Sequence, residues 1–203
     1  MVRDVSTEQK IKEAAKRVFQ KKGFGLTRTR DIAKEAGINL ALLNYYYRSK
    51  ENLFEIVMQE SIEEMFSYLE HIMNNKQTTL TEKIDAGVLR YIEGMSKNSN
   101  LPLFLFSELQ ANPQHLFDGV KIPEGFIQET YMFKQINEQI NKEKLNFTAI
   151  HFFINLVSMS IFPIIGQPFI KYVTKMDEKS FTDFIEQRKT LVPIWLKSML
   201  KLV

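Results

Sequence analysis

The sequence contains no cysteine among its 203 residues. Disulfide bonds and thiolate chemistry are therefore excluded, and the chain is compatible with a reducing cytoplasm, where we expect it to act. Its first residues, MVRDVSTEQKIKEAAKR, also lack the apolar core of a secretory signal. With 44% hydrophobic and 25% charged residues, the chain has the composition of a globular protein that can bury a core. Its length suits one large domain or two small ones.

The sequence also lacks the short motifs that mark many catalytic and metal sites. None of the three histidines, His71, His115 and His151, lies four residues from another, and no cysteine is present to assist a zinc site. No G-x-S-x-G turn presents a nucleophile, and no glycine-rich loop is available to hold a phosphate. We therefore predict a protein that is not an enzyme and that carries no cofactor or metal.

Charge is missing from residues 145–170, which contain no Asp, Glu, Lys or Arg. Long uncharged apolar stretches can span membranes. We reject that interpretation because polar residues interrupt the run, Pro163 and Pro168 divide it, and its continuous helical part at residues 147–162 is short. We predict instead a helix that is buried on two sides, one against its own core or a cavity and the other against a partner subunit.

Positive charge is concentrated in the first quarter of the chain. Residues 1–50 carry 12 Lys and Arg against 5 Asp and Glu, a balance of +7, whereas residues 51–203 carry 15 against 19, a balance of −4. A basic segment joined to a slightly acidic remainder indicates that only the first part meets a polyanion, although a chance surface excess would give the same totals.

Within that basic segment, residues 27–50 read as two short helices joined by a tight turn at residues 37–39. An earlier helix is indicated by one apolar stripe, formed by Ile11, Ala14, Ala15, Val18 and Phe19. Gly37 breaks the second helix and Asn39 is a good cap for the third. Such a pair of helices is a device for placing one helix in a DNA groove.

The residues around this turn have side chains that suit DNA. Thr27 and Thr29 can cap the second helix, and arginines at its N-terminus make a ready phosphate site. On the third helix, Asn44 can contact adenine, Ala or Leu can touch a thymine methyl group, and Tyr45 and Tyr46 can reach phosphates, whereas Tyr47 suits the core. Lys50 is a second phosphate candidate. The predicted DNA-binding residues are Thr27, Arg28, Thr29, Arg30, Asn39, Leu40, Ala41, Asn44, Tyr45, Tyr46 and Lys50.

Residues 7–55 resemble the DNA-binding domain of the TetR family of transcriptional regulators. The resemblance rests on AAKRVFQKKGFGLT, TRDIAKEAGI and LLNYYYRSKENLF. Two positions depart from it, since the family often has Lys or Ser where this chain has Leu40, and often Tyr where it has Asn44. The resemblance implies an all-α fold, with an N-terminal three-helix helix-turn-helix domain at residues 1–50. A larger helical effector-binding and dimerisation domain would follow at residues 51–203.

The remaining residues show helical patterns at about residue 51 into the seventies, 81–97, 125–142 and 180–200, with Pro193 expected to kink or break the last helix. Residues 101–106 are apolar all round, which is typical of a helix surrounded by protein. Between them, Pro113, Gly119, Pro123 and Gly125 predict a loop.

An effector pocket and a dimer interface would be built from these helices. Most of their aromatic and methionine residues are expected in the core, and His151 is most simply a histidine satisfied by backbone or water. The candidates for ligand binding are Phe104, Tyr131, Met132, His151, Asn155 and Met159. The candidates for the dimer interface are Phe153, Val157, Phe184, Leu191, Trp195 and Met199.

The sequence thus predicts a homodimeric regulator that binds a palindromic double-stranded DNA operator and does not enter a membrane. Repression, relieved when a small apolar or amphipathic effector enters the body, is what the resemblance implies. A DNA-binding regulator without a small-molecule ligand, controlled by abundance or a protein partner, is an alternative. A helical lipid-binding module or enzyme is an alternative of another class, which the charge distribution argues against.

Overall fold

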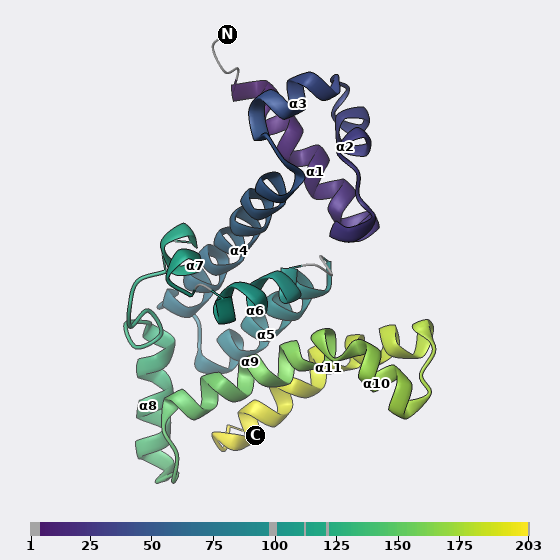
Figure 1. Cartoon of the computed structure of the whole chain (residues 1–203). Helices are drawn as coiled ribbons and strands as arrows, with labels where there is room; N and C mark the ends of the chain where they lie inside the picture. The colour runs from purple at the N-terminus through teal and green to yellow at the C-terminus, as the bar shows by residue number, and fades with distance from the viewer. Residues whose placement is uncertain (1–4, 98–100, 112, 121, 203) are drawn as a thin grey trace. The chain divides into compact units, whose positions relative to one another are not determined.

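The computed structural model describes residues 5–97, 101–111, 113–120 and 122–202 (Figure 1). These residues form α-helices joined by loops, with no β-strand among them, as the sequence predicted. The helices are α1 (Val5–Leu26), α2 (Thr29–Ala36), α3 (Leu40–Tyr47), α4 (Lys50–Asn74), α5 (Leu80–Lys97), α6 (Leu101–Ala111), α7 (Pro113–Val120), α8 (Tyr131–Glu143), α9 (Ala149–Ile165), α10 (Gln167–Thr174) and α11 (Glu178–Met199).

Packing divides the chain into two compact units. Unit 1 comprises Met1–Glu63 and Lys97–Lys121, and unit 2 comprises Glu64–Ser96 and Ile122–Val203. Helix α4 continues from one unit into the other as a single helix of 25 residues. The functional boundary expected after residue 50 stays a prediction, because a packing unit need not coincide with a functional domain.

The core of unit 1 forms where the apolar stripe of α1 meets the next helices. All five stripe residues are buried, as predicted, and α1 packs extensively against α2. Phe19 contacts Phe54 of α4 edge to face, with ring centroids 5.0 Å apart. Gly23 has a positive φ of 74°, so the helical path of α1 is interrupted there before it ends at Leu26.

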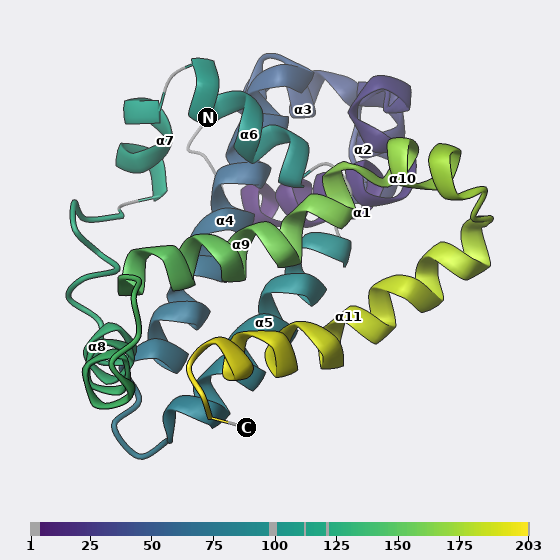
Figure 2. The same cartoon turned by 90° about the horizontal axis from the view of Figure 1, so that it is seen from below.

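The core of unit 2 is built by the last part of α4 together with α5, α8, α9 and α11. Ile84 and Val88 of α5 and Ile136 of α8 are fully buried in it, as are Phe152 of α9 and Leu196 of α11. Helices α9 and α11 pack side by side and run in opposite directions (Figures 1 and 2). These two helices present the surface that the sequence assigned to a partner subunit.

Two sequence predictions about the segment between α6 and α8 were wrong. Residues 113–120 form α7 rather than a loop, since Pro113 occupies its first position, where a missing N–H costs nothing. Helix α8 begins at Tyr131 rather than Gly125, because Thr130 caps it by accepting a hydrogen bond from the N–H of Phe133. Pro193, expected to kink or break the last helix, lies inside α11, which continues past it to Met199.

Helix α6 differs from its prediction in another way. It was expected to be surrounded by protein, and Leu101 and Leu105 are indeed buried, but Leu103 is 62% exposed.

No single helix in the described ranges is long and apolar enough to cross a membrane. Helices α9 and α10 pass that test of length and composition only as a joined pair, and they are bent by 71° at the break between them.

Candidate nucleic-acid interface

The turn between α2 and α3 is closed by backbone geometry that only a few residues tolerate. Gly37 has φ 65° and ψ 36°, the left-handed conformation that glycine adopts at no steric cost. Its N–H donates to the carbonyl of Lys34 at 3.1 Å, and the N–H of Ile38 donates to that of Ala33 at 3.0 Å. Asn39 then caps α3, since its Oδ1 accepts from the N–H of Leu42 at 2.8 Å.

The N-terminus of α2 is capped differently from the prediction. Thr27 is only 2% exposed, and its hydroxyl donates to the carbonyl of Gly23 at 2.7 Å, so it does not cap α2 and is not on the surface. The capping carboxylate belongs to Asp31, which accepts from the N–H of Arg28 at 3.1 Å. The hydrogen bond from Lys22, followed by that of the Arg28 N–H, holds the pKa of Asp31 below its ordinary value.

Two arginines stand at this end of α2 with their side chains in solvent. Arg28 and Arg30 are exposed, while Thr29 between them is half-buried. Arg48, exposed just after α3 with a positive φ of 60°, is a further phosphate candidate that the sequence analysis did not include. Its position directly after α3 was the only signal for it. Exposed guanidinium groups suit phosphate contacts.

Helix α3 turns one face to the core and one to solvent. Ala41, Asn44 and Tyr45 are exposed at the i, i+3, i+4 spacing of one helix face, and Leu40 is half-buried. Tyr47 is buried as predicted, and its hydroxyl donates to the carbonyl of Glu8 at 3.1 Å.

Tyr46 corrects the prediction of a phosphate contact, because it is only 7% exposed. It follows Tyr45 by 100° around the helix, which carries it from the solvent face to the core face.

Lys50 also differs from its predicted role as a phosphate ligand. Its Nζ donates to the carbonyls of Phe24 at 3.1 Å and Thr27 at 3.2 Å, and it lies 4.1 Å from the centroid of the Phe24 ring. These contacts tie the first residue of α4 to the end of α1 and to the loop that follows it. The ammonium group therefore holds this loop together and is only partly accessible to solvent.

The six predicted ligand residues do not line one described cavity. Phe104 lies in unit 1, packed edge to face on Phe54 at 5.7 Å, and the other five lie in unit 2. Met132 is a core residue, and His151 is exposed on the surface. Asn155 donates from Nδ2 to the sulfur of Met199 at 3.7 Å, and Met159 is half-buried. Met132 and His151 are thus placed unlike residues of an effector pocket.

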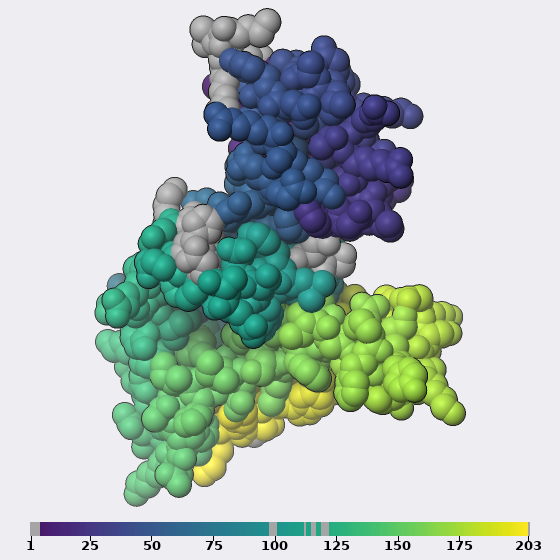
Figure 3. Space-filling view, in the orientation of Figure 1, coloured from purple at the N-terminus to yellow at the C-terminus, as the bar shows by residue number. Residues whose placement is uncertain are grey.

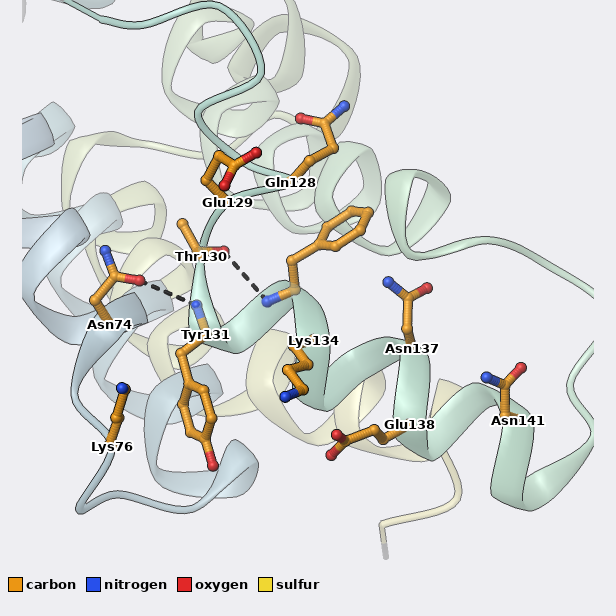
Figure 4. Close-up of a pocket in the computed structure, with 11 residues that line it drawn as sticks. Asn74, Lys76, Gln128, Glu129, Thr130, Tyr131, Lys134, Asn137, Glu138 and Asn141 are labelled. Atoms are coloured by element: carbon orange, nitrogen blue, oxygen red, sulfur yellow. Dashed lines mark hydrogen bonds between the residues drawn. The ribbon is translucent and has the colours of Figure 1, made fainter.

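Tyr131, the remaining predicted ligand residue, borders an open groove in unit 2 (Figure 4). Its N–H donates to Oδ1 of Asn74 at 3.0 Å, which joins the start of α8 to the end of α4. The other lining side chains are largely polar and include Lys134, Asn137 and Asn141 along α8. This lining differs from the apolar pocket that the sequence predicted.

The predicted dimer residues divide between the core and the surface. Phe153 is buried and stacks on Phe133 with centroids 6.0 Å apart, which corrects its assignment to the interface. Phe184 and Met199 are half-buried. The large apolar residues exposed on α9 and α11 are Val157, Leu191 and Trp195, which were among the predicted interface residues, together with Ile150, Ile154, Phe162 and Ile194, which were not.

Known proteins are similar both to the helix-turn-helix segment and to most of the chain. The family model described as "Bacterial regulatory proteins, tetR family" matches residues 11–57. The chain is similar to the probable HTH-type transcriptional regulator YttP of Bacillus subtilis, with 28% identity across 97% of this chain and 95% of that protein. It is also similar to the biofilm operon icaADBC HTH-type negative transcriptional regulator IcaR of Staphylococcus aureus, with 26% identity over 69% and 68% of the two chains.

Solved structures share the fold over nearly the whole length. A transcriptional regulator of the TetR/AcrR family from Thermobifida fusca superposes with a TM-score of 0.62 and 17% identity, covering 93% of this chain and 97% of that one. The fatty acid degradation regulator FadR from Bacillus halodurans gives a TM-score of 0.57 with 16% identity, covering 94% and 96%. At these identities the likeness concerns the fold alone.

Proposed function

Because this chain belongs to the TetR family of DNA-binding transcriptional regulators, we propose that it acts as a repressor. It binds a palindromic operator as a homodimer, with α3 of each subunit in the major groove. A small apolar or amphipathic molecule bound in unit 2 releases it. The observation that carries the DNA-binding mode is the exposed face of α3 at Ala41, Asn44 and Tyr45.

The chemistry of that face matches groove recognition. An exposed Asn can form two hydrogen bonds with adenine, and an exposed Ala methyl can contact thymine. Arg28 and Arg30 at the start of α2 supply phosphate contacts that orient α3 without reading sequence. Thr27, Tyr46 and Lys50 are left out of this proposal because their polar groups are used or buried within the protein.

Dimerisation is supported by the apolar surface of α9 and α11. Ile154 on α9 is 59% exposed, and Leu191, Ile194 and Trp195 are exposed on α11. A two-fold dimer formed through these helices would present two α3 helices to DNA. Half-sites would then lie about 34 Å apart, one helical turn of the duplex, so that the distance between subunits sets operator affinity.

Release by an effector is supported by the continuity of α4. Because α4 is one helix shared by both units, a ligand that shifts its end in unit 2 would also shift its start beside the DNA-binding helices. A coupling of about 1–3 kcal/mol would change operator affinity by roughly 5- to 150-fold. IcaR, which is similar to this chain over 69% of its length, is named a negative transcriptional regulator, and this favours repression over activation.

A selection of genomic fragments on the purified protein tests this function. We expect enrichment of sites with two-fold symmetry, and affinity that falls steeply with salt because several phosphates are neutralised. Cell-extract fractions would then be titrated against the complex of protein and operator to find the effector. If no genomic duplex binds better than random DNA, the regulator is not sequence-specific and the proposal fails.

A regulator controlled by its abundance or by a protein partner is the second candidate. The observation that favours it is the dispersal of the predicted ligand residues, with Met132 in the core and His151 at the surface. Under this alternative, no extract fraction of low molecular mass releases the operator, whereas the operator is still selected from genomic DNA. The two candidates therefore give different results in the same titration.

A further inference from the structure

Helix α10 exposes its large apolar residues. Phe169 is 62% exposed, Tyr172 is 85% exposed and Val173 is 54% exposed, and no residue of this helix is buried. Their i, i+3, i+4 spacing places them on one face. Large apolar side chains gathered on an exposed face mark an interaction site, because water contact with them is unfavourable.

Helix α10 is nevertheless held in a defined position. Gly166 forms the bend of 71° between α9 and α10, where a Cβ would lie 2.9 Å from the carbonyl oxygen of Phe162, so no other residue fits without displacing backbone. The next turn is closed by the N–H of Ile170, which donates to the carbonyl of Gly166 at 2.9 Å. An ion pair between Lys171 and Glu178 joins α10 to the start of α11. An exposed face on a fixed support is preorganised for binding.

The exposed side of α9 leads to this helix. Ile150, Ile154, Ser158 and Phe162 follow one another at four-residue spacing and are all exposed, forming one ridge along α9. The chain then bends at Gly166 and continues into α10. The yellow-green segment that contains α10 forms the outer edge of unit 2 in the space-filling view (Figure 3). Phe162 ends this ridge with its ring beside Gly166, 3.4 Å from where a Cβ would stand, and Phe169 is the first large exposed apolar residue after the bend.

We propose that α10 is an intersubunit arm whose Phe169, Tyr172 and Val173 dock onto a second copy of this chain. The inference rests on the proposed function, because it extends the α9 and α11 interface. In a two-fold dimer each subunit supplies one arm and receives the other, so every arm substitution acts twice. The arm enlarges the interface beyond the two helices and helps to fix the distance between the two copies of α3.

Three serine substitutions with nearly matched exposure separate the arm from the interface. Phe169→Ser tests the arm, and Ile154→Ser tests the α9 and α11 interface. Leu103→Ser on α6 is the control. The wild-type residues are 62%, 59% and 62% exposed, in that order. We expect Phe169→Ser and Ile154→Ser each to raise the dimer dissociation constant in analytical ultracentrifugation by about tenfold or more. We expect Leu103→Ser to leave it unchanged.

The pattern of these results distinguishes the two proposals. A weakened dimer for Ile154→Ser with an unchanged dimer for Phe169→Ser would overturn the arm and leave the proposed interface intact. No effect from either would overturn both. Equal weakening by Leu103→Ser would also overturn the arm, because loss of any exposed apolar group would then suffice.

A labelling experiment tests the docking directly. The chain has no cysteine, so Val173→Cys creates a single reactive thiol in the full-length protein, and Leu103→Cys provides the matched control. The labelling rate is measured at protein concentrations above and below the dimer dissociation constant. We expect maleimide to label position 173 at least about tenfold more slowly at the higher concentration, where the dimer forms. Labelling at position 103 should not change. If anionic lipid vesicles slow the labelling of position 173 and protein concentration does not, then α10 does not dock onto a second copy of the chain, and the proposal is overturned.

Discussion

The guanidinium group of Arg188 in α11 donates two hydrogen bonds to the carbonyl oxygen of Met159 in α9, from Nη2 at 2.7 Å and from Nε at 3.3 Å. Pro163 stands four residues after Met159 and has no N–H, so the carbonyl of Met159 lacks its regular α-helical donor. The Cζ atom of Arg188 also lies 5.5 Å from the ring of Phe184 and 5.4 Å from that of Trp195. Arg188 thereby supplies the donor that the proline removes, and it ties together the two helices of the proposed dimer interface.

Replacing Arg188 with Leu should destabilise the protein by about 1–3 kcal/mol, because the Met159 carbonyl loses its donors. In the Pro163→Ala background the same replacement should cost less, since residue 163 then offers a helical N–H. Urea denaturation at fixed protein concentration measures this double-mutant cycle.

Arg90→Leu is a suitable control for that cycle. The guanidinium group of Arg90 lies over the Tyr68 ring, 4.4 Å from its centroid, and makes no side-chain hydrogen bond in the part of the chain that the structure describes. We expect it to lose at most about 1 kcal/mol. Equal costs of Arg188→Leu in both backgrounds would show that the Met159 carbonyl does not need this donor.

The role assigned to Lys50 predicts a stability defect rather than a DNA-binding defect. Lys50→Met removes the two hydrogen bonds to the carbonyls of Phe24 and Thr27, and we expect a loss of about 1–3 kcal/mol in unfolding free energy. The salt dependence of operator binding by the folded variant should stay unchanged. For Arg30→Ala, the slope of log operator affinity against log salt concentration should instead become shallower by about one, while the unfolding free energy changes little. A lowered slope for Lys50→Met would restore its role as a phosphate ligand.

Asn44 is expected to read sequence. Asn44→Ala should reduce the preference for the operator over variants at one base pair of each half-site, by about 1–3 kcal/mol, because the two hydrogen bonds to adenine are lost. Arg28→Ala, in contrast, should weaken binding to all sequences about equally. Competition binding with a panel of single-base operator variants measures both. An unchanged base preference for Asn44→Ala would remove it from the recognition face.

Local signals in the sequence were sufficient for the helix-turn-helix. Gly37 has the positive φ expected of a helix C-cap, Asn39 has the hydrogen bond expected of an N-cap, and α3 begins directly after Asn39. Each of these features depends on residues close together in the chain. The same reasoning could not assign Thr27 and Lys50, because their partners are the backbone carbonyls of Gly23 and Phe24, which a sequence pattern does not reveal.

The rotation of α9 was harder to predict, for a physical reason. Residues 149–165 carry no charge, so no polar face indicates which side meets solvent. Phe153 was expected at the interface, but the neighbouring Ile154 is exposed and Phe153 packs in the core. Pro163 was expected to end this helix. The sequence alone could not show that Arg188, from another helix, would satisfy the carbonyl that Pro163 leaves free.

The Asp31 carboxylate should make stability depend on pH in a defined window. Its hydrogen bonds with Lys22 and with the N–H of Arg28 lower its pKa in the folded protein below the ordinary value of 3.8. The unfolded chain therefore binds the proton more readily. The stabilisation is complete above the ordinary pKa and is lost as the pH falls through the lowered, folded-state pKa.

Asp31→Asn should abolish this part of the acid sensitivity, because the amide keeps an acceptor for the Arg28 N–H but carries no charge for Lys22. Urea midpoints measured from about pH 6 down to about pH 3 should fall less steeply for the variant than for the wild type. Asp183→Asn is the control, since Asp183 is exposed and its carboxylate makes no hydrogen bond or ion pair among the described residues. Parallel curves for wild type and Asp31→Asn would mean that the carboxylate does not stabilise the start of α2, and that another group orients the exposed Arg28 and Arg30 beside it.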